Sequence, residues 1–199
     1  MKKLARILLA MILIFSISVP FVEKSAEAAK AKVYPVYFLE NIDGKFSKKL
    51  TNGLTVKIEN KYGMNTPLIL KGNKKVWTAE LASSYGFFQY TVTTNKDTFL
   101  YCTDIAGGGA RTQIIGVQSN GKVFLKKLYV GGAGMDTKFL SSNKIEVAIE
   151  RVKKNWNPSI HTNAERFTDI WDVKVYSISK TGEMKLVKKY VEKNRDISY

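Results

Sequence analysis

Apolar and polar side chains alternate with a period of two along much of the chain after residue 28. The clearest case is the sequence Leu-Thr-Val-Lys-Ile at 54–58. Such alternation is typical of a strand with one buried and one solvated face. The same pattern, or a run of β-branched and aromatic residues, predicts further strands at 33–39, 87–93, 98–103, 113–117, 122–130, 144–149, 172–178 and 184–191.

The segments between these strands are short and rich in turn residues. Asn120-Gly121 joins two of the strands, and this dipeptide tolerates the positive φ angles of a tight hairpin. No segment has a sustained 3.6-residue period, and the one helix we expect is the short segment 78–85, before Gly86. The sequence therefore predicts an all-β fold, an antiparallel meander of hairpins arranged as a partial propeller or as a β-sandwich.

The first 28 residues have a different pattern. Three basic residues lie among the first six, an apolar run covers 7–19, and Ala26-Glu27-Ala28 places small residues where a signal peptidase cleaves. The apolar run is shorter than the about 20 residues that span a bilayer. We therefore expect a signal helix at 1–28, cleavage after Ala28, a secreted or extracytoplasmic bacterial protein, and a single β domain at 29–199.

The chain carries a net charge of +15. Lysine supplies most of the positive charge, and it lacks the planar guanidinium that binds phosphates and base edges in a bidentate manner. The charge favours weak attraction to an anionic cell-wall polymer or a membrane surface, and no specific nucleic-acid partner is expected. The alternative is that the lysines only keep the protein soluble.

Cys102 is the only cysteine, so no disulfide forms within the chain. It lies in the apolar run 98–103, which favours a buried small residue over a reactive nucleophile.

Two glycine-rich segments, 107–109 and 131–134, are candidates for ligand contact, because consecutive backbone N–H groups can bind an anion. Neither has the sequence of a phosphate-binding loop, and tight connections between strands are the favoured explanation of both. If a ligand binds there, Arg111 and Asp136 are the expected polar contributors.

The segment 153–172 is a second candidate, because it is long and rich in aromatic and polar residues. Tryptophans beside hydrogen-bonding groups would suit a sugar or a peptide, or they would only anchor the loop on the core. The ligand-binding candidates in this segment are Trp156, His161, Glu165, Asp169 and Trp171.

His161 is the only histidine, and its spacing to Glu165 identifies neither a metal site nor a catalytic triad. We therefore expect no catalytic residue, no metal and no cofactor.

The hairpins at 115–130 and 175–191 echo each other, with a fainter copy at 37–50. A segment that precedes and overlaps the first of them reads Leu100-Tyr-Cys-Thr-Asp-Ile-Ala-Gly-Gly-Gly-Ala-Arg-Thr-Gln-Ile-Ile-Gly-Val117. It resembles a degenerate repeat of the FG-GAP/VCBS-like β-propeller type, and the resemblance covers about residues 98–191. The resemblance implies propeller-like blades. The alternating acidic residues that bind calcium in such repeats are missing, so Asp104 is not expected to bind calcium.

Together these features predict a secreted, non-catalytic protein of the bacterial cell envelope or exterior that binds anionic wall or surface polymers weakly. Two alternatives stay open. One is an exported hydrolase acting on wall or sugar polymers through 153–172, and the other is a β interaction module for another exported protein.

Overall fold

The computed structural model describes residues 30–42, 45–83, 85–106, 109–131, 134–157, 159–161 and 166–196. The expected signal helix at 1–28 lies outside these residues. The strands are β1 Lys32–Val33, β2 Tyr37–Phe38, β3 Ser47–Lys49, β4 Leu54–Lys61, β5 Met64–Lys71, β6 Lys74–Thr78, β7 Gly86–Val92, β8 Thr98–Ala106, β9 Gly109–Val117, β10 Val123–Gly131, β11 Met135–Ser141, β12 Lys144–Val152, β13 Phe167–Ile178 and β14 Met184–Lys193. A short 3-10 helix, η1, covers Leu39–Asn41.

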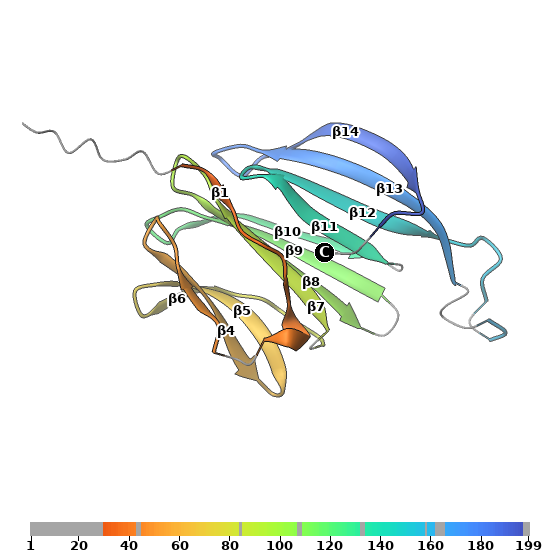
Figure 1. Cartoon of the computed structure of the whole chain (residues 1–199), viewed down its shortest axis with the longest axis horizontal. Helices are drawn as coiled ribbons and strands as arrows, with labels where there is room; N and C mark the ends of the chain where they lie inside the picture. Colours follow the sequence, from red (N-terminus) through yellow and green to blue (C-terminus); the bar gives the residue numbers. More distant parts are fainter. Residues whose placement is uncertain are drawn as a thin grey trace, which may run out of the picture.

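The strands form three antiparallel sheets built mainly from consecutive hairpins, and β1 and β2 join sheet A by pairing with β7 (Figure 1). Sheet A has the order β1-β7-β8-β9-β10, and β2 also pairs with β7. Sheet B is β3-β4-β5-β6, and sheet C is β11-β12-β13-β14. The predicted all-β, antiparallel fold is confirmed. No described helix is long and apolar enough to cross a lipid bilayer.

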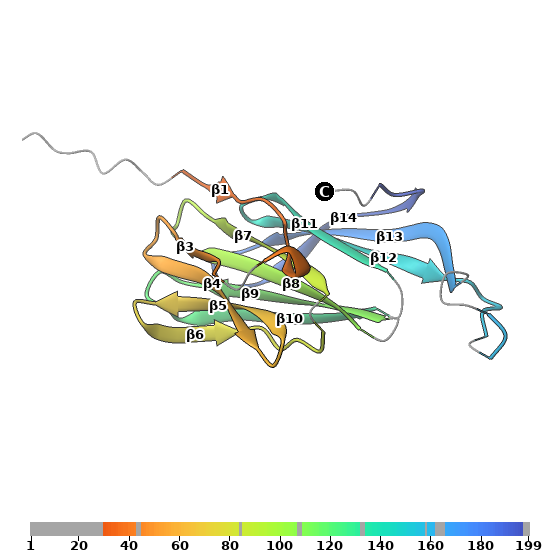
Figure 2. The ribbon, with the colours of Figure 1, turned by 60° about the horizontal axis from the view of Figure 1, so that its bottom comes forward.

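Sheet A is the middle layer and packs against a sheet on each face (Figure 2). Phe88, Tyr90 and Leu100 contribute to one core with sheet B, whereas Phe87 and Tyr101 contribute to a second core with sheet C. Every residue of β7 is therefore buried. This explains why β7 reads as a continuous run instead of an alternating one. The described sheets stack as layers, in the manner of the sandwich alternative.

The expected helix at 78–85 is wrong. β6 continues to Thr78, and the N–H of Ala79 donates to the carbonyl of Pro67 as in a strand. Residues 79–83 then cross sheet A as an irregular segment, which we call the crossing link. Its backbone groups bind side chains of sheet A, so they are not available to each other for helical hydrogen bonds.

The chain re-enters sheet A at Gly86, and no other residue type fits at this position. Its φ is +147°, and a Cβ atom there would lie 2.0 Å from the carbonyl oxygen of Thr103. The sharp entry into β7 thus depends on this residue.

Candidate functional site

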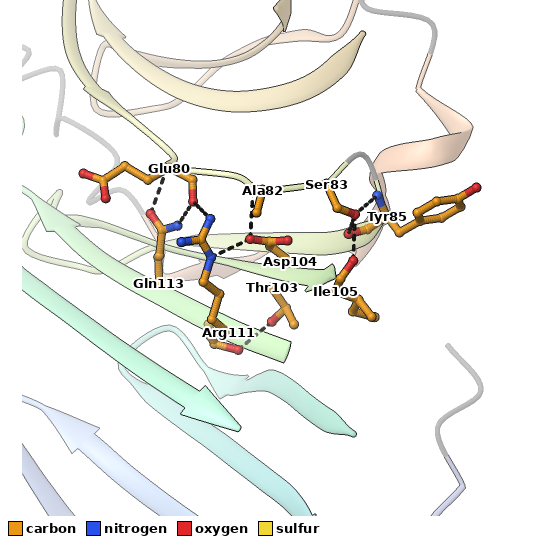
Figure 3. A network of polar contacts seen from close by, with 10 residues as sticks. Glu80, Ala82, Ser83, Tyr85, Thr103, Asp104, Ile105, Arg111 and Gln113 are labelled. Atoms are coloured by element: carbon orange, nitrogen blue, oxygen red, sulfur yellow. Dashed lines mark hydrogen bonds and ion pairs between the residues drawn. The ribbon is translucent and has the colours of Figure 1, made fainter. Parts of the chain in front are cut away.

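Arg111 lies in a polar network between the crossing link and sheet A (Figure 3). It is opposite Asp104 in the β8–β9 pairing, and its Nε donates to Oδ2 of Asp104 at 2.6 Å. Its Nη2 donates to the carbonyl oxygen of Glu80 at 2.7 Å, and the Ala82 N–H donates to the same Asp104 oxygen at 3.1 Å. Gln113 exchanges two hydrogen bonds with the backbone of Glu80. Arg111 therefore fixes the crossing link to the sheet.

The Asp104 carboxylate is only half satisfied by this network. Its side chain is 1% exposed, and its Oδ1 is buried without a hydrogen-bond partner. In Figure 3 this oxygen points away from Arg111. Most buried carboxylate oxygens have a partner, so this one needs an explanation.

Asp104 and Arg111 also line a cavity of about 270 Å³, which we call the Asp104 pocket. Its other walls are small or apolar: Ala82, Ala106, Gly109, Ala110, Val130 and Gly131. The chemistry available in this pocket is a hydrogen-bond acceptor beside an apolar surface.

Asp136 belongs to a different network, on the outer face of sheet C. Its Oδ2 accepts from Nε of Arg195 at 2.5 Å, and the same guanidinium donates to Glu146 and, at 2.5 Å, to Glu192. The side chain of Arg195 is 3% exposed and that of Asp136 is 2% exposed. Burial raises the pKa of the Asp136 carboxyl although Arg195 acts against the rise. Arg111 and Asp136 thus lie on different sheets and do not share a site.

Glu146 is the centre of this second network. Burial alone would raise its pKa, but hydrogen bonds from Arg195 and Tyr190 lower the pKa of the carboxyl below its ordinary value. The Tyr190 hydroxyl donates to Glu146 at 2.8 Å. In this arrangement a buried arginine is bound by carboxylates, and its role is to stabilise the fold.

The candidates of 153–172 are dispersed. Trp171 lies inside β13 and is buried on the outer face of sheet C. The Asp169 N–H donates to Glu150 at 2.9 Å, and Asp169 has a φ of +56°. Trp156 is half-buried, and the guanidinium of Arg166 lies over its ring, with the guanidinium carbon 4.8 Å from the centre of the Trp156 ring. Glu165 lies outside the described residues.

His161 is held by its own turn. Its Nδ1 accepts from the N–H of Asn157 at 3.1 Å, so the imidazole stabilises the turn to which it belongs. No three histidine, cysteine or acidic side chains of the described residues come together in a way that could hold a metal ion.

Cys102 is fully buried, as expected from its apolar run. Burial also raises the pKa of its thiol well above the ordinary value, which keeps it protonated at neutral pH.

A basic surface on sheet C was not predicted. The exposed lysines Lys174 and Lys189 lie directly opposite each other in the β13–β14 pairing. Lys193, four residues after Lys189, is exposed on the same face of β14, whereas Lys188 lies beside Tyr190 on the opposite face. We call Lys174, Lys189 and Lys193 the lysine ladder. The sequence shows the lysines, but their grouping depends on which strands pair.

The Asp104–Arg111 pair was also missed, although the sequence carries a signal for it. The two residues are equally distant from the midpoint between positions 107 and 108, and β8 and β9 pair antiparallel about that point, with Ala106 opposite Gly109. The pairing follows from this symmetry.

Comparison with known proteins adds no family. No protein-family model, no curated protein and no solved structure matches this chain. The resemblance of residues 98–191 to propeller-type repeats stays a prediction.

Proposed function

We propose that this chain is a non-catalytic protein of the cell envelope or exterior that binds anionic polymers, and that the lysine ladder is its main contact surface. The observation that carries the proposal is the direct pairing of Lys174 with Lys189. Like charges opposite each other weaken a sheet, and an anionic partner would remove that repulsion.

The surroundings of the ladder neutralise its charge only in part. Asp172 is the nearby acidic residue on β13, and both of its oxygens accept from Arg151, at 2.6 and 3.0 Å. The ladder is therefore a surface of excess positive charge.

Three of the four buried acidic residues of the described chain are already engaged by arginines. Asp104 binds Arg111, and Asp136 and Glu146 bind Arg195. These carboxylates serve the fold, which argues against a paired-carboxylate hydrolase built from them. The positive charge of the lysines at the surface is thus the more available feature.

Retention on immobilised polyphosphate and on purified cell walls tests the proposal. The variant Lys174→Glu/Lys189→Glu reverses two ladder charges, and Lys48→Glu/Lys49→Glu makes the same change of net charge on exposed β3. A lysine near an anionic surface contributes about 1 kcal/mol, so loss of the two lysines alone should weaken binding roughly thirtyfold at low salt, and the two added carboxylates should weaken it further.

The β3 variant should keep most of the retention, and circular dichroism should show both variants folded. Added salt should weaken wild-type retention, because screening shortens the range of the attraction. Equal losses in both variants would show that only net charge counts. Absence of wild-type retention at low salt would reject the function itself.

A further inference from the structure

We infer that the Asp104 pocket binds an uncharged polyol or sugar unit, with a ligand hydroxyl donating to Oδ1 of Asp104. The starting observation is the buried oxygen. Asp104 is 1% exposed and uses Oδ2 for both Arg111 and Ala82, while Oδ1 has no partner. An ionised carboxylate oxygen can only accept, so the missing partner is a donor.

The charge of the pocket restricts that donor. Arg111 lies 2.6 Å from Asp104 and balances its charge. A cationic ligand would therefore add an unbalanced charge next to a guanidinium, and an anionic ligand would meet a carboxylate. A neutral hydroxyl satisfies Oδ1 without changing the balance.

The walls and the size restrict the rest of the ligand. Apart from Asp104 and Arg111, the lining side chains are alanine and valine, and the remaining positions are glycine. The volume of about 270 Å³ is just below the about 300 Å³ at which pockets for drug-sized ligands begin. This suits one small unit with apolar C–H groups and hydroxyls, which describes a polyol or a single sugar ring.

The pocket is open to solvent at Val130. This residue is 73% exposed and lies at the end of β10, the edge strand of sheet A. A ligand can therefore reach the pocket from this side, and contact with Oδ1, which is buried from solvent, requires a small shift of the Asp104 side chain or of the crossing link at Ala82. The pocket is on sheet A and the lysine ladder is on sheet C, so the two proposals are tested separately.

Amide chemical shifts of the full-length, isotope-labelled protein provide the test. Glycerol, ribitol and glucose are titrated as separate arms to distinguish an open-chain polyol from a ring. We expect saturable shifts at Ala82, Ala106 and Arg111 with at least one of them. Salt should not weaken this binding, whereas it weakens binding to the ladder.

Two controls make the result specific. Trimethoxypropane, the methyl ether of glycerol, cannot donate, so it should bind at least about tenfold more weakly than glycerol if glycerol binds. Val130→Trp should obstruct the opening and weaken binding of the arm that binds at least about tenfold. Leu128→Trp, on the same strand and 58% exposed, should leave binding unchanged because Leu128 does not line the pocket.

The absence of saturable shifts in all three arms would overturn the inference. So would equal binding of the ether and glycerol, since the apolar walls alone would then explain it. Persistence of the shifts in Val130→Trp would place the ligand elsewhere. None of these outcomes depends on retention by polyphosphate.

Discussion

At the residue scale, burial separates arginines that the sequence does not distinguish. The side chain of Arg195 is 3% exposed and holds three carboxylates, whereas that of Arg151 is 46% exposed and holds only Asp172. Asp136 was a candidate ligand residue because it lies beside the glycine-rich segment 131–134. Its partner, Arg195, is 59 positions away, and no local pattern reports such a contact.

Replacing Arg195 should destabilise the protein strongly. Arg195→Ala would leave Asp136 and Glu146 buried without their counter-charge, which costs about 3–5 kcal/mol. Arg151→Ala removes an exposed pair that solvent screens, and it should cost much less than Arg195→Ala. Urea unfolding at pH 7 measures both values, and similar costs for the two variants would contradict the structural role of Arg195.

The cost of Arg195→Ala should also depend on pH. The lowered pKa of Glu146 contributes stability above its unfolded pKa of about 4.5, and this is lost as the pH falls through the folded value. Asp136, whose pKa burial raises, loses the opposing effect of Arg195 in the variant, so its pKa rises further. Both changes favour proton binding by the folded variant.

The difference in unfolding free energy between wild type and Arg195→Ala should therefore be largest near pH 7 and shrink below about pH 4.5. Unfolding curves at several pH values measure it. A difference that stays constant with pH would show that the arginine acts through packing alone.

At the element scale, alternation predicts strands well where one face is wet. β4 and β12 were found in this way, with ends within three residues of the observed ones. β3, β5, β6 and β11 were missed. β5 contains Pro67 and has four consecutive buried residues, so it has neither a clean alternation nor the usual strand composition.

The region 33–39 also differs from the expected single strand. It is divided into β1, β2 and the start of η1, and Pro35 lies between the two strands. A proline cannot donate to a ladder, so pairing with β7 is interrupted there. Register is therefore the part of the fold that residue patterns describe least.

The crossing link provides the prediction at this scale. Arg111→Ala removes the counter-charge of buried Asp104 and the donor to Glu80, so we expect a loss of about 2–3 kcal/mol. The Ala82 amide should exchange its hydrogen faster, because the segment loses an anchor.

Combining Arg111→Ala with Asp104→Asn should recover part of the stability, since a neutral amide costs less to bury than an unpaired carboxylate. Hydrogen exchange and urea unfolding of the single and double variants measure this. Unchanged Ala82 exchange in Arg111→Ala would mean that Gln113 and the backbone hold the link without the arginine.

At the scale of the whole molecule, sheet A belongs to both cores. Leu100 packs toward sheet B and Tyr101, the next residue, toward sheet C. The sequence indicates that these strands are apolar, but it does not indicate that two different sheets cover them. A period of two identifies a buried face and not the layer that buries it.

Because the cores share one sheet, we expect a single unfolding transition. Ile58→Ala in sheet B and Ile145→Ala in sheet C each remove a fully buried side chain and should each cost about 2–5 kcal/mol. Leu140→Ala, at a position 48% exposed, is the control and should stay within about 0.5 kcal/mol of wild type.

Scanning calorimetry, together with near-ultraviolet circular dichroism, measures these shifts. Both core variants should lower the midpoint of the same transition. Two separate transitions, with only one of them moved by each variant, would show that the outer sheets unfold independently.

The pairing of β1 with β7 has a consequence for the order of assembly. Lys32 is among the first described residues to be synthesised, yet its place is beside Val92, which is made much later. Until β7 exists, the beginning of the chain has no strand to join. Of the described strands of sheet A, β1 is made first but can be added only once β7 exists.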